Sequence, residues 1–265
     1  MTDPARLLAH IDNDALLDTL CGIARAAGAE VMEVYERDFA VKQKDDRSPV
    51  TAADIRAERV ILQGLAKAAP GVPVISEEAA SAGHWPETGD RFFLVDPLDG
   101  TKEFIGRNGE FTVNIALIAD GDPVMGVVGA PARQRLYAGV GDRAFVEDGT
   151  GTRACRAIHA RPAPADGIVA VASRSHRSPE TDAYLDRFQI KDLRAAGSSL
   201  KFCLVAAGEA DLYPRLGPTM EWDSAAGHAG LRAAGGRVET LDGAPLRYGK
   251  RADGYRNPHF VARGR

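Results

Sequence analysis

The feature that most constrains this chain is an unbroken apolar run that ends in two carboxylates. Phe92 to Val95 contain no polar side chain, and Asp96 and Asp99 follow directly. A run without alternation is typical of a strand buried on both faces, so its end can hold charged groups rigidly at the floor of a cleft. We expect Pro97 to stiffen a turn between the two acids.

Two carboxylates at this spacing favour a hard metal ion. Burying an unpaired carboxylate costs several kcal/mol, roughly the effective penalty per ion in real proteins, and a divalent cation removes that cost. Oxygen ligands select Mg²⁺ first and Mn²⁺ or Ca²⁺ second, and the Leu98 carbonyl can join them. A helix that opens at Gly100 and Thr101 would offer free amides to phosphate. An ordinary surface turn is the alternative interpretation, because Asp, Pro and Gly all form turns.

Length and charge limit the classes of protein and partner. The chain has 265 residues, of which 45% are hydrophobic and 26% charged, and this suits one or two globular domains with a sizeable core. The formal net charge of −4 argues against a nucleic-acid polymer or an anionic membrane surface as partner. A local basic pocket for a small anion remains compatible with that charge.

Cysteine spacing and the N-terminal segment favour the cytoplasm. The 3 cysteines are far apart and form no Cys-x-x-Cys pair, so neither a disulfide framework nor a thiolate metal site is indicated. The first residues lack a signal-peptide pattern, and no run of about 18 uncharged apolar residues could span a bilayer. We therefore expect a cytoplasmic protein with no integral membrane segment. Peripheral contact with the inner face of the cell membrane stays open, as does the choice between monomer and homodimer.

The first half of the chain has an α+β pattern. Apolar spacing predicts one helix over 14–35 and another over 51–69, where Thr51 and Asp54 form a capping box. A short strand is expected over 73–75. Further strand-like runs predict an antiparallel meander over 111–119, 124–128, 135–140 and 144–146.

A domain boundary is expected near residue 150. Residues 1–150 would form an α+β domain that carries most metal ligands, and residues 151–265 an α/β domain with Asp223 and the nucleotide contacts. The elements expected in the second domain are a strand over 167–172, a helix that Ser198 or Ser199 caps and that reaches Ala207, a helix over 224–234 with Asp223 at its head, and a closing hairpin over 238–248.

Two motif matches are set aside. Residues 139–144 fit the Gly-x-Gly-x-x-Ala dinucleotide pattern, but they lie between two antiparallel strands and open no helix, so a hairpin turn is favoured. Ser198 to Lys201 fit the Ser-x-x-Lys of penicillin-recognising enzymes, but the accompanying motifs of those enzymes are absent. Neither nicotinamide chemistry nor a nucleophilic serine is expected.

Acids from separate segments give a stronger signal. Glu77, Asp96, Asp99 and Asp223 each fall at a strand end or a helix start, where side chains from distant parts of the chain can converge. Taken alone, Asp223 would be a helix cap and Asp54 a capping-box acid. Convergence of the set favours a shared metal site.

Three motifs resemble those of the Mg²⁺-dependent, lithium-sensitive inositol monophosphatase superfamily. Their order and spacing agree across nearly the whole chain: Glu77-Glu78, Asp96-Pro97-Leu98-Asp99-Gly100-Thr101 and Trp222-Asp223-Ser224-Ala225-Ala226-Gly227. Within the superfamily the chain looks most like the CysQ-type 3'(2'),5'-bisphosphate nucleotidases. The segments that carry this closer similarity are 99–104, 173–176 and 197–203.

The resemblance implies a fold and a set of metal ligands. The fold is a layered αβαβα sandwich with its site between two domains. Glu77, Asp96 and the Leu98 carbonyl would hold one Mg²⁺, while Asp96, Asp99 and Asp223 would hold another, with Asp96 bridging. Two or three ions are expected in all, and Mn²⁺ is a possible substitute.

The catalytic group implied by the resemblance is Asp54, Glu77 and Thr101. Thr101, supported by Asp54, would orient the attacking water, and the amides of Gly100 and Thr101 would hold phosphate oxygens. Two metal ions can serve both ends of an in-line displacement without a covalent phosphoenzyme. The metal ligands Glu77, Leu98, Asp99 and Asp223 would contact the substrate as well.

The implied substrate is a small bisphosphate nucleotide, adenosine 3'(2'),5'-bisphosphate, which would be cleaved to AMP and phosphate. His176, Ser198, Lys201 and Arg215 match positions around its second phosphate, although a helix cap, solvated charges and a loop histidine are the structural alternatives. Arg215 carries the most weight, because arginine binds phosphate through bidentate hydrogen bonds and simple inositol monophosphatases place an acid in this region.

Three questions about function stay open at this point. The chain could instead be an inositol or sugar phosphate monoesterase, since the metal motifs are shared across the superfamily. It could also be a non-catalytic Mg²⁺-binding partner that has kept the fold, although intact Thr101 and Asp54 argue against this. Whether the phosphorylated sulfate donor PAPS is cleaved as well is not decided by these motifs.

Overall fold

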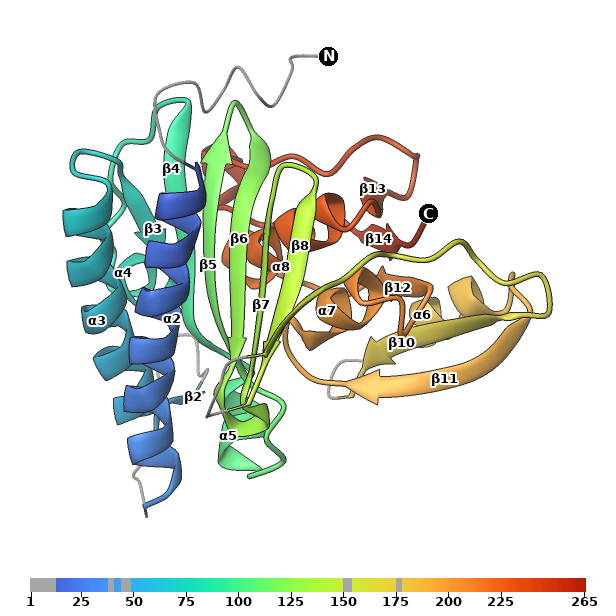
Figure 1. The fold of residues 1–265 in the computed structure, drawn as a ribbon, viewed down its shortest axis with the longest axis horizontal. Helices are drawn as coiled ribbons and strands as arrows, with labels where there is room; N and C mark the ends of the chain where they lie inside the picture. The colour runs from blue at the N-terminus through green and yellow to red at the C-terminus, as the bar shows by residue number, and fades with distance from the viewer. Residues whose placement is uncertain (1–12, 38–40, 44–48, 150–153, 175–177) are drawn as a thin grey trace.

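Two β-sheets, with helices between and outside them, form the fold in the computed structural model (Figure 1). The structure describes residues 13–37, 41–43, 49–149, 154–174 and 178–265. The boundary expected near residue 150 lies outside the described residues. β9, which begins at Ala154, still pairs with the first sheet.

The layers alternate between helices and sheets. α2 (Asn13–Tyr35) and α3 (Ala52–Ala68) cover one face of a seven-stranded sheet, and α8 (Glu221–Ala233) covers the other. α7 (Leu200–Ala206) packs beside α8 against a five-stranded sheet, whose far face carries α6 (Pro179–Leu185). The predicted αβαβα sandwich is therefore confirmed, as are the two N-terminal helices.

The seven-stranded sheet contains the predicted meander. Its first two strands are parallel, as suits a connection that carries a helix, and each later strand is antiparallel to the one before it. In order across the sheet, the strands are β3 (Val74–Ser76), β4 (Arg91–Asp99), β5 (Thr112–Ala119), β6 (Asp122–Ala130), β7 (Arg135–Val140), β8 (Arg143–Asp148) and β9 (Ala154–Ala157).

The five-stranded sheet is mixed. Its first three strands are parallel to one another, and the strand from the C-terminal end of the chain lies antiparallel to both of its neighbours. In order, the strands are β11 (Ile190–Ala196), β10 (Ile168–Ser173), β12 (Leu212–Arg215), β14 (Phe260–Arg263) and β13 (Arg237–Thr240). Shorter elements are β1 (Lys42–Gln43), β2 (Pro49–Val50), α4 (Glu77–Ser81), α5 (Thr101–Ile105), η1 (Pro131–Arg133) and η2 (Arg251–Asp253).

The apolar run of β4 is buried on both faces, as its sequence predicts. Phe93 and Val95 face the cluster under α2 and α3, while Phe92 and Leu94 face the cluster around α8. Each of these side chains is at most 3% exposed. The strand that ends in the acids is therefore fixed from two sides.

Small residues let α8 lie directly on the sheet. A Cβ at Gly126 of β6 would lie 2.4 Å from the carbonyl oxygen of Ala226, and one at Gly139 of β7 would lie 2.8 Å from Gly230 Cα. Neither position has room for a side chain. This close approach brings the first turn of α8, with Asp223, to the end of β4.

The hairpin predicted over 238–248 forms only close to its turn. Beyond Asp242 and Gly243 an antiparallel bridge joins Glu239 to Pro245, and the amides of Thr240 and Leu246 donate to the carbonyls of Ala244 and Val238 at 2.8 Å and 3.1 Å. The chain then leaves the five-stranded sheet, because the amide of Tyr248 donates to the Gly121 carbonyl of the other sheet at 3.0 Å. β13 also pairs with β14, a pairing that the sequence did not predict.

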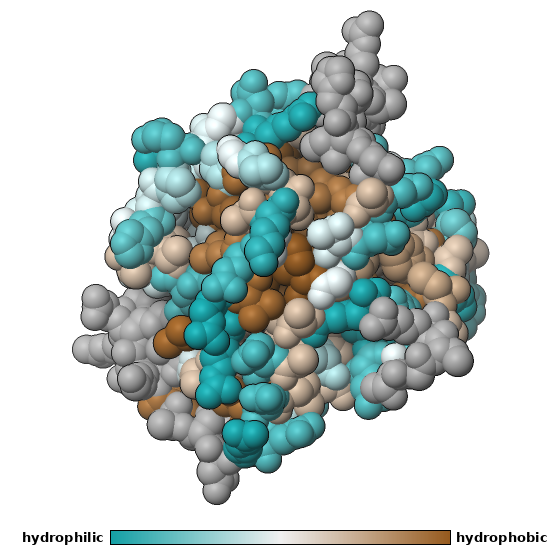
Figure 2. All heavy atoms as spheres, turned by 60° about the vertical axis from the view of Figure 1, so that its left-hand side comes forward, coloured by the Kyte–Doolittle hydropathy of each residue, from teal (hydrophilic) through white to brown (hydrophobic). Residues whose placement is uncertain are grey.

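The outer helices present a mixed surface. On the face turned forward in Figure 2, hydrophilic side chains frame apolar surface that stays visible between them. Ile55 of α3, for example, is 58% exposed. Among the helices that the structure describes, none combines the length and the apolar character needed to cross a bilayer.

Candidate active site

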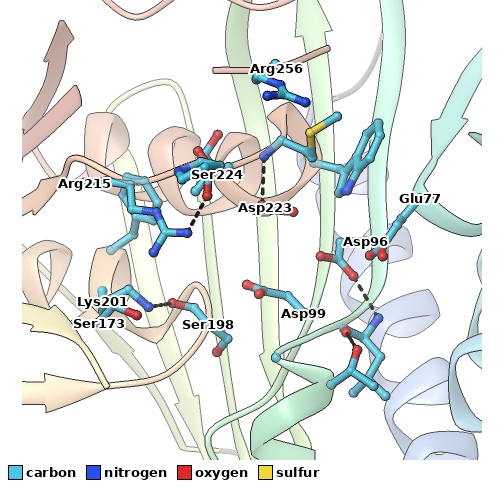
Figure 3. Close-up of a pocket in the computed structure, with 18 of the residues that line it drawn as sticks. Glu77, Asp96, Asp99, Ser173, Ser198, Lys201, Arg215, Asp223, Ser224 and Arg256 are labelled. Atoms are coloured by element: carbon cyan, nitrogen blue, oxygen red, sulfur yellow. Dashed lines mark hydrogen bonds between the residues drawn. The ribbon is translucent and has the colours of Figure 1, made fainter. Parts of the chain in front are cut away.

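A cavity of about 630 Å³ opens where the end of β4, the first turn of α8 and the end of β12 meet. Figure 3 shows acidic side chains on one side of this cavity and Ser198, Lys201 and Arg215 on the other. The predicted site residues that line it are Glu77, Asp96, Leu98, Asp99, Gly100, Thr101, Ser198, Lys201, Arg215 and Asp223. Asp54 is not part of the cavity wall, and His176 lies outside the described residues.

The two acids of β4 are separated by a bulge and not by the predicted turn. Asp96 pairs with Asn114 and Asp99 with Thr112, so three steps along β4 match two along β5. Pro97 has no amide hydrogen to donate, which suits a bulge position. The free amide of Leu98 donates to Asp96 Oδ1 at 3.0 Å. Both carboxylates therefore reach the cavity from one continuous strand.

Asp96 is the most deeply buried of the acids that line the cavity, with 1% of its surface exposed. Burial raises its pKa well above the ordinary value, and the charges of Glu77, Asp99 and Asp223 raise it further. A hydrogen bond with Glu77 adds to this effect. Two carboxyl groups can share such a bond only through a proton, and a divalent cation can take the place of that proton.

Asp99 and Asp223 are half-buried and held by hydrogen bonds. Asn114 Nδ2 donates to Asp99 Oδ2 at 3.2 Å, and the amide of Met220 donates to Asp223 Oδ2 at 2.8 Å. Burial raises the pKa of Asp99, against the opposing charge of Lys201. Burial and the charge of Asp99 raise the pKa of Asp223 to about 8. Both groups would release their protons more readily beside a cation.

The predicted start of α8 needs a correction. The helix begins at Glu221, so Asp223 lies inside the first turn and does not precede it as a cap. Its carboxylate satisfies the amide of Met220, the residue that does precede the helix. Glu77 likewise begins α4, directly after β3. Helix starts thus bring two acids toward the end of β4.

This donor set fits a hard divalent ion. The acidic side of the cavity offers carboxylates and the Leu98 carbonyl, which are the oxygen ligands that Mg²⁺ prefers. Within the described residues, no three His, Cys, Asp or Glu side chains are already gathered as tightly as in a finished metal site. Repulsion among like charges is a physical reason for that wider spacing.

Thr101 and Asp54 do not contact each other through a hydrogen bond. Thr101 Oγ1 donates to the Leu98 carbonyl at 3.3 Å. Asp54 Oδ2 instead accepts from the amide and the hydroxyl of Thr51, both at 2.8 Å, as the predicted capping box requires. Burial raises the pKa of Asp54 to about 6, and the charge of Glu77 contributes. Asp54 belongs to α3 and Thr101 to α5, and their cooperation stays a prediction.

Lys201 is a buried cation, with 3% of its surface exposed. Its Nζ donates to the carbonyls of Ser198 and Ala196, and it lies 5.4 Å from the ring centre of Tyr213. Burial lowers the pKa of Lys201 to about 8, against the charge of Asp99. Lys201 thus lies with Arg215 on the side of the cavity opposite the acids.

Arg215 and Ser198 hold unused hydrogen-bonding groups. Arg215 donates to the carbonyl of Pro218 at 2.6 Å, while its Nε is buried and has no partner among the described residues. The hydroxyl of Ser198 is likewise buried without a partner, so the expected helix cap does not form. Buried donors without partners are costly and rare. An anion in this half of the cavity would satisfy both.

Two residues, one beside the cavity and one that lines it, had no functional signal in the sequence. Ser199 donates to the backbone carbonyl of Asp223 at 2.6 Å and accepts from Asn114 at 3.0 Å, so it links the acids of both halves. Trp85, which is 38% exposed, stacks on Tyr255 with ring centres 5.6 Å apart and lines the opening. The one sequence signal that could have placed Trp85 at the site is that it is an isolated tryptophan in a polar loop.

Comparison with known proteins identifies a family and several relatives that this chain is similar to. The model of the inositol monophosphatase family matches residues 12–259. The chain is 47% identical over 247 residues to the 3'(2'),5'-bisphosphate nucleotidase CysQ of Escherichia coli (strain K12), which covers 92% of this chain and 98% of that protein. The enzyme of the same name from Haemophilus influenzae is 31% identical, with 95% and 94% of the two chains covered.

Solved structures show the same fold. The crystal structure of CysQ from Bacteroides thetaiotaomicron, a bacterial member of the inositol monophosphatase family, aligns with a TM-score of 0.79 at 39% identity and covers 96% of this chain and 99% of that one. An inositol monophosphatase from Anabaena aligns with a TM-score of 0.74 at 26% identity, covering 94% and 90% of the two chains.

Proposed function

The chain belongs to the inositol monophosphatase family, and on that premise we propose that it removes the 3'(2')-phosphate of adenosine 3'(2'),5'-bisphosphate to give AMP and phosphate. The observation that carries the proposal is the division of one cavity into an acidic side and a side with the cations Lys201 and Arg215 and two hydrogen-bonding groups without partners among the described residues. The first suits a metal-assisted phosphatase, and the second suits a substrate with another phosphate. The relatives named as 3'(2'),5'-bisphosphate nucleotidases support this choice.

The metal would be held by Glu77, Asp96, the Leu98 carbonyl, Asp99 and Asp223. When bound, Mg²⁺ lowers the pKa of a water molecule and neutralises charge on the leaving oxygen. We propose two or three ions, because Asp96 lies between the other acids and is influenced by all of them. Mn²⁺ is the expected substitute, since it accepts the same oxygen ligands.

The scissile phosphate would lie against the start of α5. Gly100 has a φ of 90°, a left-handed conformation that favours glycine, and Thr101 begins the helix there. We propose that these two amides hold phosphate oxygens, while Thr101, with Asp54 behind it, orients the attacking water. Attack of water on phosphorus forms one P–O bond and breaks the bond to the ribose oxygen, which leaves with a proton as the hydroxyl of AMP.

The second phosphate would lie at the opposite side of the cavity. Arg215 can donate from its buried Nε, Ser198 from its hydroxyl and Lys201 from its ammonium group. Charge-assisted hydrogen bonds of this kind are shorter and stronger than neutral ones. His176 is proposed as a further contact from the motif alone.

Phosphate release from several substrates tests the proposal. Adenosine 3',5'-bisphosphate, inositol 1-phosphate and a sugar phosphate are each incubated with Mg²⁺, with Mg²⁺ and Li⁺, and with a chelator. We expect the nucleotide to be cleaved fastest in Mg²⁺. Its cleavage should be slower when Li⁺ is added and absent in the chelator. Preferred cleavage of inositol 1-phosphate would favour the monoesterase alternative, and the absence of turnover on every substrate would favour a non-catalytic role.

A further inference from the structure

Glu110, which lies between α5 and β5, gathers donors from distant segments. It is 6% exposed, and Arg174 donates to its two oxygens through Nε at 2.8 Å and a terminal nitrogen at 2.9 Å. Arg133 donates at 2.8 Å, and the amide of Gly197 also donates at 2.8 Å. One buried carboxylate therefore satisfies donors from three separate parts of the chain.

Two of these donors belong to the segments that carry the resemblance to bisphosphate nucleotidases. Arg174 follows β10 in the motif 173–176, and Gly197 opens the motif 197–203. Glu110 itself follows the acidic end of β4 by eleven positions and belongs to the opposite half of the fold. We call 173–176 and 197–203 the nucleotide-side segments. The hydrogen bonds of Glu110 thus connect both of them to the part of the chain that carries the acids.

The segment beside Glu110 is tightly packed and strained. A Cβ at Gly197 would lie 2.7 Å from the Glu110 carbonyl oxygen and 2.7 Å from Glu103 Cγ, so only glycine fits there. The next residue, Ser198, has a φ of 46° and presents its buried, unpartnered hydroxyl to the cavity. Its carbonyl accepts from Lys201. A left-handed serine persists only where its surroundings hold it in place.

We propose that Glu110 is a positioning residue for substrate selection, because it fixes Gly197 and Arg174 and thereby holds Ser198 and Lys201 where the second phosphate binds. This inference rests on the proposed function. Glu110 does not touch the substrate and is not among the residues that line the cavity. Its effect should therefore be confined to ligands that carry the second phosphate.

The charge of Glu110 is maintained by its partners. Burial alone would raise its pKa, but the hydrogen bonds from Arg174 and Gly197, with the charges of Arg174 and Arg133, outweigh burial and lower it. The carboxylate is therefore ionised throughout the neutral range. Replacing it with an amide keeps the shape of the side chain, removes the charge and leaves fewer acceptor positions for the same donors.

Glu110→Gln is the first test, with two substrates that differ in one group. Adenosine 3',5'-bisphosphate carries the second phosphate, and adenosine 3'-monophosphate has the same scissile bond without it. We expect KM for the bisphosphate to rise about tenfold to a hundredfold, as a small displacement of a binding group can cause. The kcat for the bisphosphate, and both constants for the monophosphate, should stay close to those of the wild type.

Direct binding gives a readout without turnover. Isothermal titration with AMP, which keeps the 5'-phosphate, should show a loss of affinity in Glu110→Gln similar to the rise in KM. Titration with adenosine should show no difference from the wild type. Arg174→Gln removes the two hydrogen bonds that Arg174 donates to Glu110 and leaves the one from the Gly197 amide. If Glu110→Gln folds poorly, this variant, whose altered side chain is 46% exposed, should show the same substrate selectivity with a smaller rise in KM.

Arg133→Gln is the matched control. Arg133 also pairs with Glu110, at the same oxygen as a terminal nitrogen of Arg174, but its side chain is 44% exposed and it belongs to η1, outside the sequence of both nucleotide-side segments. We expect less than about a twofold change in KM, in line with the small value of exposed ion pairs.

Two outcomes separate this inference from the proposed function. Equal losses on both adenosine substrates in Glu110→Gln and Arg174→Gln, at unchanged thermal stability, would overturn the positioning role while leaving the phosphatase intact. If the wild-type protein itself shows no preference for the bisphosphate over the monophosphate, the second-phosphate site is wrong and the inference falls with it.

Discussion

The two sides of the cavity are built in different ways. On the acidic side, Asp96 and Asp99 extend from a strand buried on both faces, and hydrogen bonds from Leu98 and Asn114 hold their carboxylates. On the basic side, Arg215 and Ser198 retain donors without partners. The acidic side has more negative charge than its surroundings neutralise, and the basic side has more donors than acceptors. This contrast is what a metal-assisted reaction on an anionic substrate requires.

The largest expected effect is on the acidic side. Asp96→Asn should reduce Mg²⁺-dependent phosphate release at least about a thousandfold on every substrate, because a central ligand is lost and catalysis of phosphoryl transfer is mainly electrostatic. Thermal stability should be unchanged or higher, since the substitution removes a carboxyl group whose charged form is opposed by burial and by the neighbouring acids. Phosphate release and thermal unfolding are measured together, with the exposed Asp90→Asn as control. Near-normal turnover in Asp96→Asn would remove the acidic side from the mechanism.

A smaller and more selective effect is expected on the basic side. Arg215→Ala should raise KM for adenosine 3',5'-bisphosphate about tenfold to a hundredfold, the value of one or two hydrogen bonds between charged groups. The KM for inositol 1-phosphate should change little, because that substrate has no second phosphate. Steady-state kinetics on both substrates decide the matter, with the exposed Arg194→Ala as a charge-matched control. Equal effects on the two substrates would contradict the division of the cavity.

How much of this arrangement the sequence predicts depends on how far apart along the chain the interacting residues lie. The β4 run, the capping box at Thr51 and the meander follow from local periodicity, and each is confirmed. The hairpin over 238–248 forms only close to its turn, and the pairing of β13 with β14 is one that no local pattern indicates. The convergence of the acids was predicted because each lies at an element's end.

Contacts between segments far apart in the chain are not indicated by any local sequence pattern. Ser199 and Asn114 are 85 positions apart, and Gly197 and Glu110 are 87 apart, yet each pair forms a hydrogen bond. The bulge between Asp96 and Asp99 also depends on its register with β5, which the residues of β4 alone do not determine. Sequence motifs thus predicted which residues carry the chemistry, while the structure was needed to show what positions them.

The pH dependence sharpens the comparison further. Burial lowers the pKa of Lys201 to about 8, so the side chain is charged below that pH and neutral above it. The kcat/KM for adenosine 3',5'-bisphosphate should therefore fall, relative to that for adenosine 3'-monophosphate, as the pH rises through 8. Taking the ratio cancels the titration of groups common to both reactions. Lys201→Arg should remove the decline, because arginine stays charged. A constant ratio from neutral to alkaline pH would exclude Lys201 from the phosphate site.

The smallest expected effect concerns the helix that carries Asp223. His228 of α8 is buried against Tyr248, and burial lowers its pKa from 6.5 to about 3. Below pH 6.5 the unfolded chain therefore binds a proton that the folded protein does not, so the free energy of unfolding decreases as the pH is lowered. The loss at pH 5.5 should be about 1.4 kcal/mol. Denaturant unfolding of the wild type and His228→Gln at two pH values isolates this contribution, and an identical pH dependence of the two proteins would show that His228 is not kept neutral.

One ratio tests most directly the claim that a single cavity cleaves at its acidic side and selects at its basic side. It is kcat/KM of the wild-type protein for adenosine 3',5'-bisphosphate divided by kcat/KM for adenosine 3'-monophosphate, both in Mg²⁺. Contacts from Arg215, Lys201 and Ser198 to the second phosphate predict a ratio of at least about one hundred. A ratio near one would show that the second phosphate is not recognised and would contradict the account.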